Sequence, residues 1–205
     1  MKAFVVLAAA LLTIARAAAP DPPVAPGPHR GGVTDRYDDY FRKYTKRYFG
    51  VGFDWRLFKA QAIAESGLHP DARSAAGARG IMQLMPSTYA QIASVRPNYQ
   101  SIDDPQWNIA AGILHDRWLW EYWADKSAED DHHRFMLASY NAGEIPIARA
   151  QGIARRSQLD PTIWPSVVQV APRVPRWRYR ETVGYVRTID GTYERIRAAD
   201  IAPVP

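Results

Sequence analysis

Hydrophobic and polar residues recur with the period of an α-helix over most of this chain. Between Tyr37 and Tyr48 the aromatic residues lie three, four, seven and eleven positions from the first, with Lys and Arg between them. The stretch from Asp54 to Glu65 and the stretch 178–197 show a similar spacing of apolar residues. No run alternates convincingly with the period of a β-strand, and no segment repeats. The pattern therefore predicts a single all-α domain.

Proline, glycine and capping residues divide the remaining sequence into further elements. The triplet Asp103-Asp104-Pro105 is typical of a helix start, because aspartate caps a helix and proline suits its first turn. The helix that follows carries an apolar stripe from Trp107 to Tyr122. Prolines predict an irregular segment over 160–175. The other expected helices are 86–92, 132–140 and 144–154.

The N-terminus has the composition of a secretory signal peptide, residues 1–19. Lys2 precedes an apolar run, 3–14, that is too short to span a bilayer comfortably, and small residues at 17–19 offer a cleavage site. This signal-peptide pattern predicts a periplasmic or secreted protein. A retained N-terminal anchor is the alternative. A Pro/Gly-rich linker is expected over 20–33, the helical domain over 34–197 and a short C-terminal tail over 198–205.

Composition excludes several kinds of site. The 205 residues include no cysteine, which rules out disulfides, thiolate metal ligands and the lipidated cysteine of a bacterial lipoprotein. The net charge of +5 is small, and the basic stretches 36–47 and 173–180 are typical of solvated helix faces, so we expect no nucleic-acid partner. His132 and His133 are adjacent and fall on different helix faces. They predict a helix start in solvent, and we expect no metal and no other cofactor.

The candidate for chemistry is Glu65, which closes one of the predicted helices and is followed by Ser66 and Gly67. Asp54 would cap the start of this helix, and Gly67 would end it. The negative end of the helix dipole and the apolar neighbours would raise the pKa of the Glu65 carboxyl. A carboxylic acid that is protonated near neutral pH can give its proton to a leaving oxygen. A surface glutamate at a helix end is the structural alternative.

Three further segments combine amide, phenol and carboxyl side chains with turns and helix ends. They are the glycine- and methionine-containing stretch 77–86, the Tyr-Asn-Ala-Gly stretch that ends at Gly143, and the Glu-Thr-x-x-Tyr-Val stretch that begins at Glu181. Each alone has a structural explanation as core or as a helix cap. Together with Glu65-Ser66, and in this order, they resemble the soluble lytic transglycosylase family, lysozyme-like enzymes that cleave bacterial peptidoglycan.

This resemblance implies a lysozyme-like fold and a lytic transglycosylase that acts on peptidoglycan glycan strands. Glu65 would be the single catalytic acid and base. It would protonate the oxygen between N-acetylmuramic acid and N-acetylglucosamine, and then accept the proton of the muramoyl C6 hydroxyl. The C6 oxygen would close a 1,6-anhydro ring, so that no water is needed. We expect a monomer, and an envelope or secretion-machine protein fits as a further partner.

The resemblance also implies roles for residues around Glu65. Ser66 would orient its carboxyl, Tyr140 would lie near it and near the substrate acetamido group, and Tyr185 would help to close the site. Glu181 would bond to substrate or to a neighbouring active-site group. Gln83 and Met85 would contact the glycan. Asn141 would brace the loop that presents Tyr140.

Two other functions stay open on the sequence. A lysozyme of the same fold would hydrolyse the same bond, and it needs a second carboxylate about 5–5.5 or 6.5–9.5 Å from the first. A non-catalytic peptidoglycan-binding or assembly scaffold would also keep the fold, but it has no need of Glu65 or of the glycan-contacting segments. The carboxylates that could assist hydrolysis are Asp71, Asp103, Glu144 and Glu181.

Overall fold

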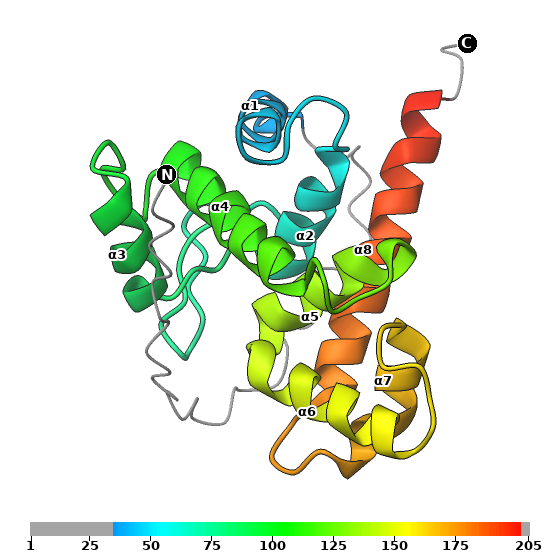
Figure 1. Cartoon of the computed structure of the whole chain (residues 1–205). Helices are drawn as coiled ribbons and strands as arrows, with labels where there is room; N and C mark the ends of the chain where they lie inside the picture. Colours follow the sequence, from blue (N-terminus) through cyan, green and yellow to red (C-terminus); the bar gives the residue numbers. More distant parts are fainter. Residues whose placement is uncertain (1–34, 202–205) are drawn as a thin grey trace, which may run out of the picture.

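The computed structural model describes residues 35–201 and contains, within them, eight α-helices and two short 3-10 helices (Figure 1). This part of the chain has no β-strand, and Arg79 makes two isolated bridges, to Arg73 and to Leu84. The all-α prediction is therefore confirmed. The helices in chain order are α1 (Asp38–Phe49), α2 (Arg56–Ser66), α3 (Pro86–Val95), α4 (Pro105–Trp123), η1 (Glu129–Asp131), α5 (His132–Ala142), α6 (Glu144–Arg156), α7 (Trp164–Val170), η2 (Ala171–Arg173) and α8 (Tyr179–Ile201).

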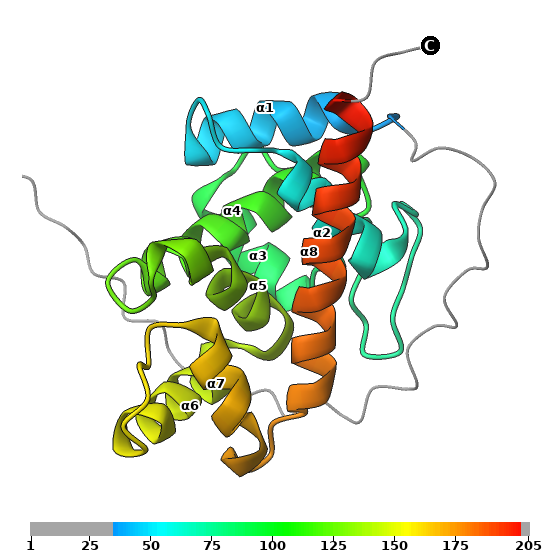
Figure 2. The same ribbon diagram turned by 90° about the vertical axis from the view of Figure 1, so that its right-hand side faces the viewer.

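Helix α2 lies near the centre of the molecule, with α1, α4 and α8 around it (Figures 1 and 2). Helix α8 packs along α2 and against α5, while α4 packs on α1 and α5. Helices α6 and α7 pack on each other at one end, and α3 packs against α4 (Figure 1). Phe58 of α2, Ile113 of α4, Phe135 of α5 and Ile189 of α8 are all 0% exposed. The shared core therefore fixes where the last turn of α2 lies.

Local chemistry sets the helix boundaries. Gly67 ends α2 in the left-handed conformation with a φ of 62°, and its N–H donates to Ile63 O at 2.9 Å, as the sequence predicts. Asp104 caps α4 as predicted, accepting from two backbone N–H groups of the first turn at 2.8 and 3.2 Å. The prediction for Asp54 is wrong by one position. It lies just outside the cap of α2, although its Oδ1 still accepts from the Arg56 N–H at 3.0 Å.

The stretch 160–175 is more regular than predicted, because it contains α7 and the 3-10 helix η2. Pro165 lies in the first turn of α7, where a proline needs no hydrogen-bond partner and does not break the helix. Trp164, Val167 and Val170 recur three residues apart and are all buried. A short amphipathic helix thus occupies a segment that its prolines make look irregular.

The last helix, predicted over 178–197, is longer than expected, because α8 continues to Ile201. The Arg56 guanidinium lies 2.6 Å from the Asp200 carboxylate and ties this last turn to the start of α2. The predicted signal peptide, the linker and the last four residues of the tail lie outside the described residues. Across residues 35–201, no helix combines the length and the apolar character needed to cross a membrane.

Two aromatic predictions need correction. Trp118 and Tyr122, at the end of the apolar stripe of α4, are 37% and 41% exposed, because Trp123 takes the core-facing position instead. His132, predicted to lie in solvent, is buried. Its ring stacks on the Trp120 ring with 3.7 Å between centroids, and its Nε2 lies 2.8 Å from Trp120 O. The partner lies on another helix, which the local sequence does not reveal.

Candidate active site

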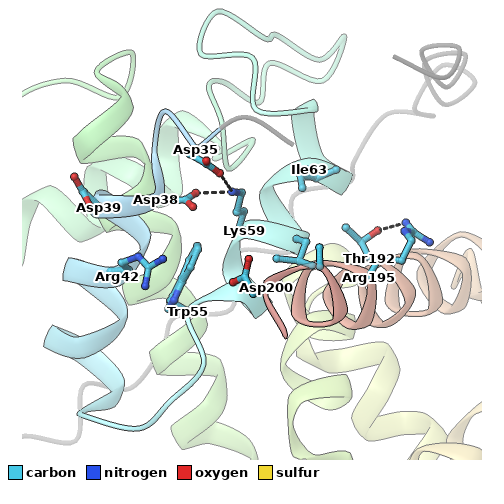
Figure 3. Close-up of a pocket in the computed structure, with 12 residues that line it drawn as sticks. Asp35, Asp38, Asp39, Arg42, Trp55, Lys59, Ile63, Thr192, Arg195 and Asp200 are labelled. Atoms are coloured by element: carbon cyan, nitrogen blue, oxygen red, sulfur yellow. Dashed lines mark hydrogen bonds and ion pairs between the residues drawn. The ribbon is translucent and has the colours of Figure 1, made fainter. Parts of the chain in front are cut away.

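Glu65 lies in the last turn of α2, next to the Gly67 cap, and the residue is partly exposed. Another face of α2 is tied down by Lys59, whose ammonium lies 2.6 Å from Asp38 and 3.5 Å from Asp35 (Figure 3). Lys59 is only 3% exposed, so the carboxylates compensate a charge that has lost its contact with water. These ion pairs fix the rotation of α2 and hence the side on which Glu65 emerges.

A hollow of about 650 Å³ opens over that anchored face, between α1, α2 and the end of α8 (Figure 3). Lys59 and Ile63 of α2 line it together with Trp55, the residue that caps α2, and the three recur every fourth position and so share one helix face. Glu65 is not among the lining residues. The hollow is therefore separate from the surroundings of Glu65. No group of three or more His, Asp or Glu side chains suited to hold a metal occurs in the described part of the chain.

Tyr185 on α8 contacts Glu65 directly. Its O–H donates to Glu65 Oε1 at 2.6 Å, across 120 residues of sequence. Burial raises the pKa of Tyr185 well above its usual value, and the charge of Glu65 raises it further. Tyr185 is therefore a neutral hydrogen-bond donor under working conditions. The geometry gives this residue a more direct place than predicted, because it holds the candidate acid itself.

Tyr140 reaches the same region from the end of α5. Its O–H donates to Met82 O at 2.8 Å, and its ring centroid lies 5.2 Å from that of His115. Burial raises the pKa of Tyr140 well above its usual value, and the charges of Asp116 and Glu65 raise it further. The electrostatic interaction of Tyr140 with Glu65 means that the two side chains lie in the same region of the structure.

The loop between α2 and α3 presents Gln83 and Met85. Gln83 has a positive φ of 46°, and its Nε2 donates to the O atoms of Ala72 and Gly80 at 3.1 and 2.9 Å. Both side-chain N–H groups of Gln83 thus brace the loop. Met85 is partly exposed at the start of α3, whereas Met82 is fully buried.

Asn108 of α4 holds this loop in place, a role that the sequence does not predict. Its Oδ1 accepts from the Met82 N–H at 2.7 Å, and its Nδ2 donates to the O atoms of Arg79 and Ile102 at 3.0 and 2.9 Å. Gly80 has a φ of 76°, and a Cβ at this position would lie 2.5 Å from Asn108 Nδ2. Glycine is therefore required both by the backbone conformation and by the close approach of Asn108.

Ser66 has a different role from the predicted one. Its O–H donates to Ile81 O at 2.8 Å, with a second contact to Ala62 O at 3.3 Å. A hydroxyl has one proton, so this bond leaves none to donate to the Glu65 carboxylate. Ser66 ties the end of α2 to the loop that carries Gln83.

Two further assignments are refined by the geometry. Asn141 lies within α5 rather than in a loop, and its Oδ1 accepts from the Thr182 O–H at 3.0 Å, so it braces α5 against α8. Glu181 is exposed at the start of α8 and lies 3.2 Å from the Arg178 guanidinium. It precedes Tyr185 by four residues and therefore shares its helix face, one turn away.

A buried polar pair beside Glu65 is missed by the sequence analysis. Gln61, one turn earlier on α2, donates its Nε2 to Asp116 Oδ1 of α4 at 3.2 Å, and both residues are 0% exposed. Burial raises the pKa of Asp116 well above its usual value, whereas burial lowers the pKa of the neighbouring His115 to about 4. The sequence gives no clear signal for this pair, because Asp116 lies between His115 and Arg117, and Gln61 lies two residues after Lys59.

Comparison with known proteins places these features in one family. The Transglycosylase SLT domain family matches residues 39–162. Membrane-bound lytic murein transglycosylase F of Pseudomonas putida (strain W619) is 34% identical over 155 residues, which cover 74% of this chain and 30% of the relative. The protein of the same name from Shewanella pealeana is 31% identical over 150 residues, which cover 73% and 29%.

Solved structures share the fold. The 70 kDa soluble lytic transglycosylase of Escherichia coli matches with a TM-score of 0.63 and 24% identity, over 80% of this chain and 25% of its own. An inactive mutant of lytic transglycosylase Slt from Pseudomonas aeruginosa matches with a TM-score of 0.65 and 19% identity, over 84% and 26%. The predicted lysozyme-like fold of the lytic transglycosylases is thus confirmed.

The extent of these matches determines what they establish. This chain spans about 30% of the length of the curated relatives it matches, so their activities as whole proteins do not transfer directly. The family match itself lies inside the helical domain and includes Glu65, Gln83 and Tyr140. It covers more than half of the 205 residues. The chain therefore belongs to the Transglycosylase SLT domain family.

Proposed function

We propose that this chain is a peptidoglycan lytic transglycosylase in which Glu65 is the single catalytic acid and base. The observation that carries the proposal is the hydrogen bond from Tyr185 to Glu65, which fixes the carboxyl of this partly exposed residue at the end of α2. Membership of a transglycosylase domain family supports the reaction, and the curated relatives are murein transglycosylases by name. The substrate class is therefore the glycan strand of peptidoglycan.

The first half of the reaction uses Glu65 as an acid. Its proton moves to the oxygen that joins N-acetylmuramic acid to N-acetylglucosamine, the bond from C1 to this oxygen breaks, and positive charge develops at the muramoyl C1. The acetamido group of the muramoyl unit stabilises this charge, in the vicinity of Tyr140. The neutral Tyr185 O–H stabilises the carboxylate that Glu65 becomes, because it already points at Oε1.

The second half uses Glu65 as a base. Its carboxylate accepts the proton of the C6 hydroxyl while the C6 oxygen bonds to C1 and closes the ring. Glu65 ends in the protonated state in which it began. No water is consumed, because the nucleophile belongs to the substrate and acts at high effective molarity. The product ends in 1,6-anhydro-N-acetylmuramic acid.

The remaining site residues have supporting roles in the proposal. The Gln83 amide oxygen and the Met85 side chain contact the glycan, since both are presented on the loop that Ser66 and Asn108 hold against α2 and α4. Glu181 contributes to the same face of α8 as Tyr185, and its ion pair with arginine keeps it at the surface rather than against Glu65.

Hydrolysis is the nearest alternative, and it requires a second carboxylate that can position a water. Asp103 is paired with Arg79, and Glu181 is paired with a neighbouring arginine. Asp116 interacts electrostatically with Glu65 but is 0% exposed, so it cannot place a water against a substrate. These environments make Asp103, Glu181 and Asp116 poor candidates for the second carboxylate that hydrolysis needs.

The cellular setting follows from the sequence alone. The signal-peptide-like N-terminus and the absence of cysteine support a periplasmic or secreted enzyme, in contact with the cell wall. We expect the domain to act as a monomer without a cofactor or nucleic acid. An envelope or secretion-machine protein remains a compatible partner.

A clearing assay on purified sacculi tests the proposal. Glu65→Gln keeps the size of the side chain and removes the transferable proton, so clearing should fall by about 10²–10⁴-fold or more. Glu194→Gln is the matched control, because this carboxyl lies on α8 with 67% of its side chain exposed. The control should clear sacculi like the parent, and circular dichroism should show both variants helical.

Two results would contradict the proposal. Near-parental clearing by a folded Glu65→Gln protein would assign the acid to another residue. A parent protein that binds sacculi and never clears them would instead support the non-catalytic scaffold.

A further inference from the structure

The contact between α2 and α4 contains two fully buried polar side chains with one hydrogen bond between them. Gln61 Nε2 donates to Asp116 Oδ1 at 3.2 Å, and both residues are 0% exposed. The other two oxygens, Gln61 Oε1 and Asp116 Oδ2, have no hydrogen-bond partner among the described residues. Both are acceptors when Asp116 is ionised, so neither can satisfy the other in that state.

The charges around Asp116 do not favour its ionised form. The titratable groups that interact with it are Glu65 from α2, Tyr140 from α5 and Tyr185 from α8, and none of these is a cation. Its neighbour His115 is neutral, because burial lowers the pKa of this ring to about 4. A buried carboxylate that has one neutral donor and no cation is strongly disfavoured.

One proton resolves both problems. A protonated Asp116 is a donor as well as an acceptor, and its O–H can donate to Gln61 Oε1 while its carbonyl oxygen accepts from Gln61 Nε2. The two side chains then form a reciprocal acid–amide pair in which every buried polar atom has a partner. Burial raises the pKa of Asp116, the Gln61 donor lowers it, and the Glu65 charge raises it again, with a net rise.

We propose that Asp116 remains a protonated carboxylic acid in the folded protein at neutral pH, paired reciprocally with Gln61. It is a positioning residue. Gln61 lies one turn before Glu65 on α2, so the pair fastens α2, the helix that carries Glu65, to α4. The pair also leaves the site with one titrating carboxyl, Glu65. This second consequence rests on the proposed function, whereas the protonation of Asp116 does not.

Direct detection of the proton tests the inference without any enzyme assay. In protein labelled with ¹³C at the aspartate carboxyl carbons, one resonance should have the shift of a protonated acid at neutral pH. That resonance should be missing from Asp116→Asn. A parent spectrum in which every aspartate resonance has the ionised shift at neutral pH would overturn the proposal.

The pH dependence of stability gives a second test with a defined sign. The unfolded chain releases the Asp116 proton at a pH near 4, whereas the folded protein keeps it, so the parent loses stability as the pH rises above about 4. Asp116→Asn keeps the reciprocal pairing and has no proton to lose. Its melting temperature should therefore exceed that of the parent at neutral pH, and the two should converge near pH 4.

Asp131→Asn is the matched control, because Asp131 is also buried but is paired with the Arg134 guanidinium and accepts from the Trp164 N–H at 2.8 Å. This substitution should lower the melting temperature at neutral pH. A similar loss in Asp116→Asn would show that Asp116 is ionised in the folded protein.

The activity profile addresses the link to Glu65. Replacing a neutral acid by a neutral amide should leave the pH limits of sacculus clearing where they are in the parent. If Asp116 carried a charge, its removal would let Glu65 ionise more readily, and the alkaline limit would move to lower pH. Such a move would contradict the proposal. A parent without any activity would overturn the proposed function and leave the spectroscopic and stability results to decide the state of Asp116.

Discussion

The hydrogen bond from Tyr185 to Glu65 can be removed by a single atom change, Tyr185→Phe. The substitution leaves the ring in place and deletes the donor that lies 2.6 Å from Glu65 Oε1. A hydrogen bond to a charged group contributes about 1.5–3 kcal/mol. In the proposed mechanism the charge appears on Glu65 as it gives up its proton. We therefore expect kcat to fall by about 10- to 150-fold.

The same substitution should change the pH dependence of the reaction. The Tyr185 O–H stabilises the ionised carboxylate of Glu65, so without it Glu65 keeps its proton to higher pH. Since one pH unit corresponds to about 1.36 kcal/mol, the alkaline limit of the kcat/KM profile should move upward by about 1–2 units. A general loss of folded protein would lower the rate without moving this limit.

Clearing rates of purified sacculi across pH provide the assay, with Tyr193→Phe as the control. Tyr193 lies on the same helix and donates a comparable hydrogen bond to a carboxylate, Asp54 Oδ2, at 3.1 Å. The control should keep the parental rate and profile, because Asp54 lies at the other end of α2. Parental kcat together with parental pH limits in Tyr185→Phe would refute the role given to this hydrogen bond.

Three further outcomes are expected. Asn108→Ala removes three hydrogen bonds, two of them fully buried, to Arg79, Met82 and Ile102, and it should lower the free energy of unfolding by about 2–4 kcal/mol in urea denaturation; a loss below about 1 kcal/mol would contradict the bracing role. Activity should survive EDTA, and a loss that one divalent ion restores would reveal a metal site. N-terminal sequencing of the exported protein should begin at Pro20, whereas Met1 in a membrane fraction would show a retained anchor.

The helical architecture could be predicted wherever a helix is long and buries one face. The regular spacing around Phe58 and Ile189 reflects that burial, so α2 and α8 are readable from the sequence alone. Helix α7 is only seven residues long and has a proline in its first turn, which leaves too few positions for a period to emerge. The stacking of His132 on Trp120 depends on the approach of two helices, and no local pattern encodes it.

The site could be predicted as a set of segments but not as a set of contacts. The order of the segments identifies Glu65, Tyr140 and Tyr185, yet the bond between Tyr185 and Glu65 arises from the packing of α8 along α2. Ser66 follows Glu65 in sequence, but Ile81 O competes for its only proton.

The buried partners of the site follow the same logic. Nothing in the sequence marks Gln61 and Asp116 as partners, and they become a pair only when α2 meets α4. Both residues stand close to other polar residues in the sequence, so the local pattern gives neither their positions nor their pairing.

The chemistry of the released glycan ends tests the central claim most directly. The full chain is incubated with purified sacculi, and the fragments are weighed by mass spectrometry before and after treatment with borohydride. If Glu65 acts alone, the ends are 1,6-anhydro-N-acetylmuramic acid, lighter by one water than a hydrolysis product and unchanged by borohydride. Mainly reducible muramic acid ends would contradict the account, because they require a second carboxylate that positions a water.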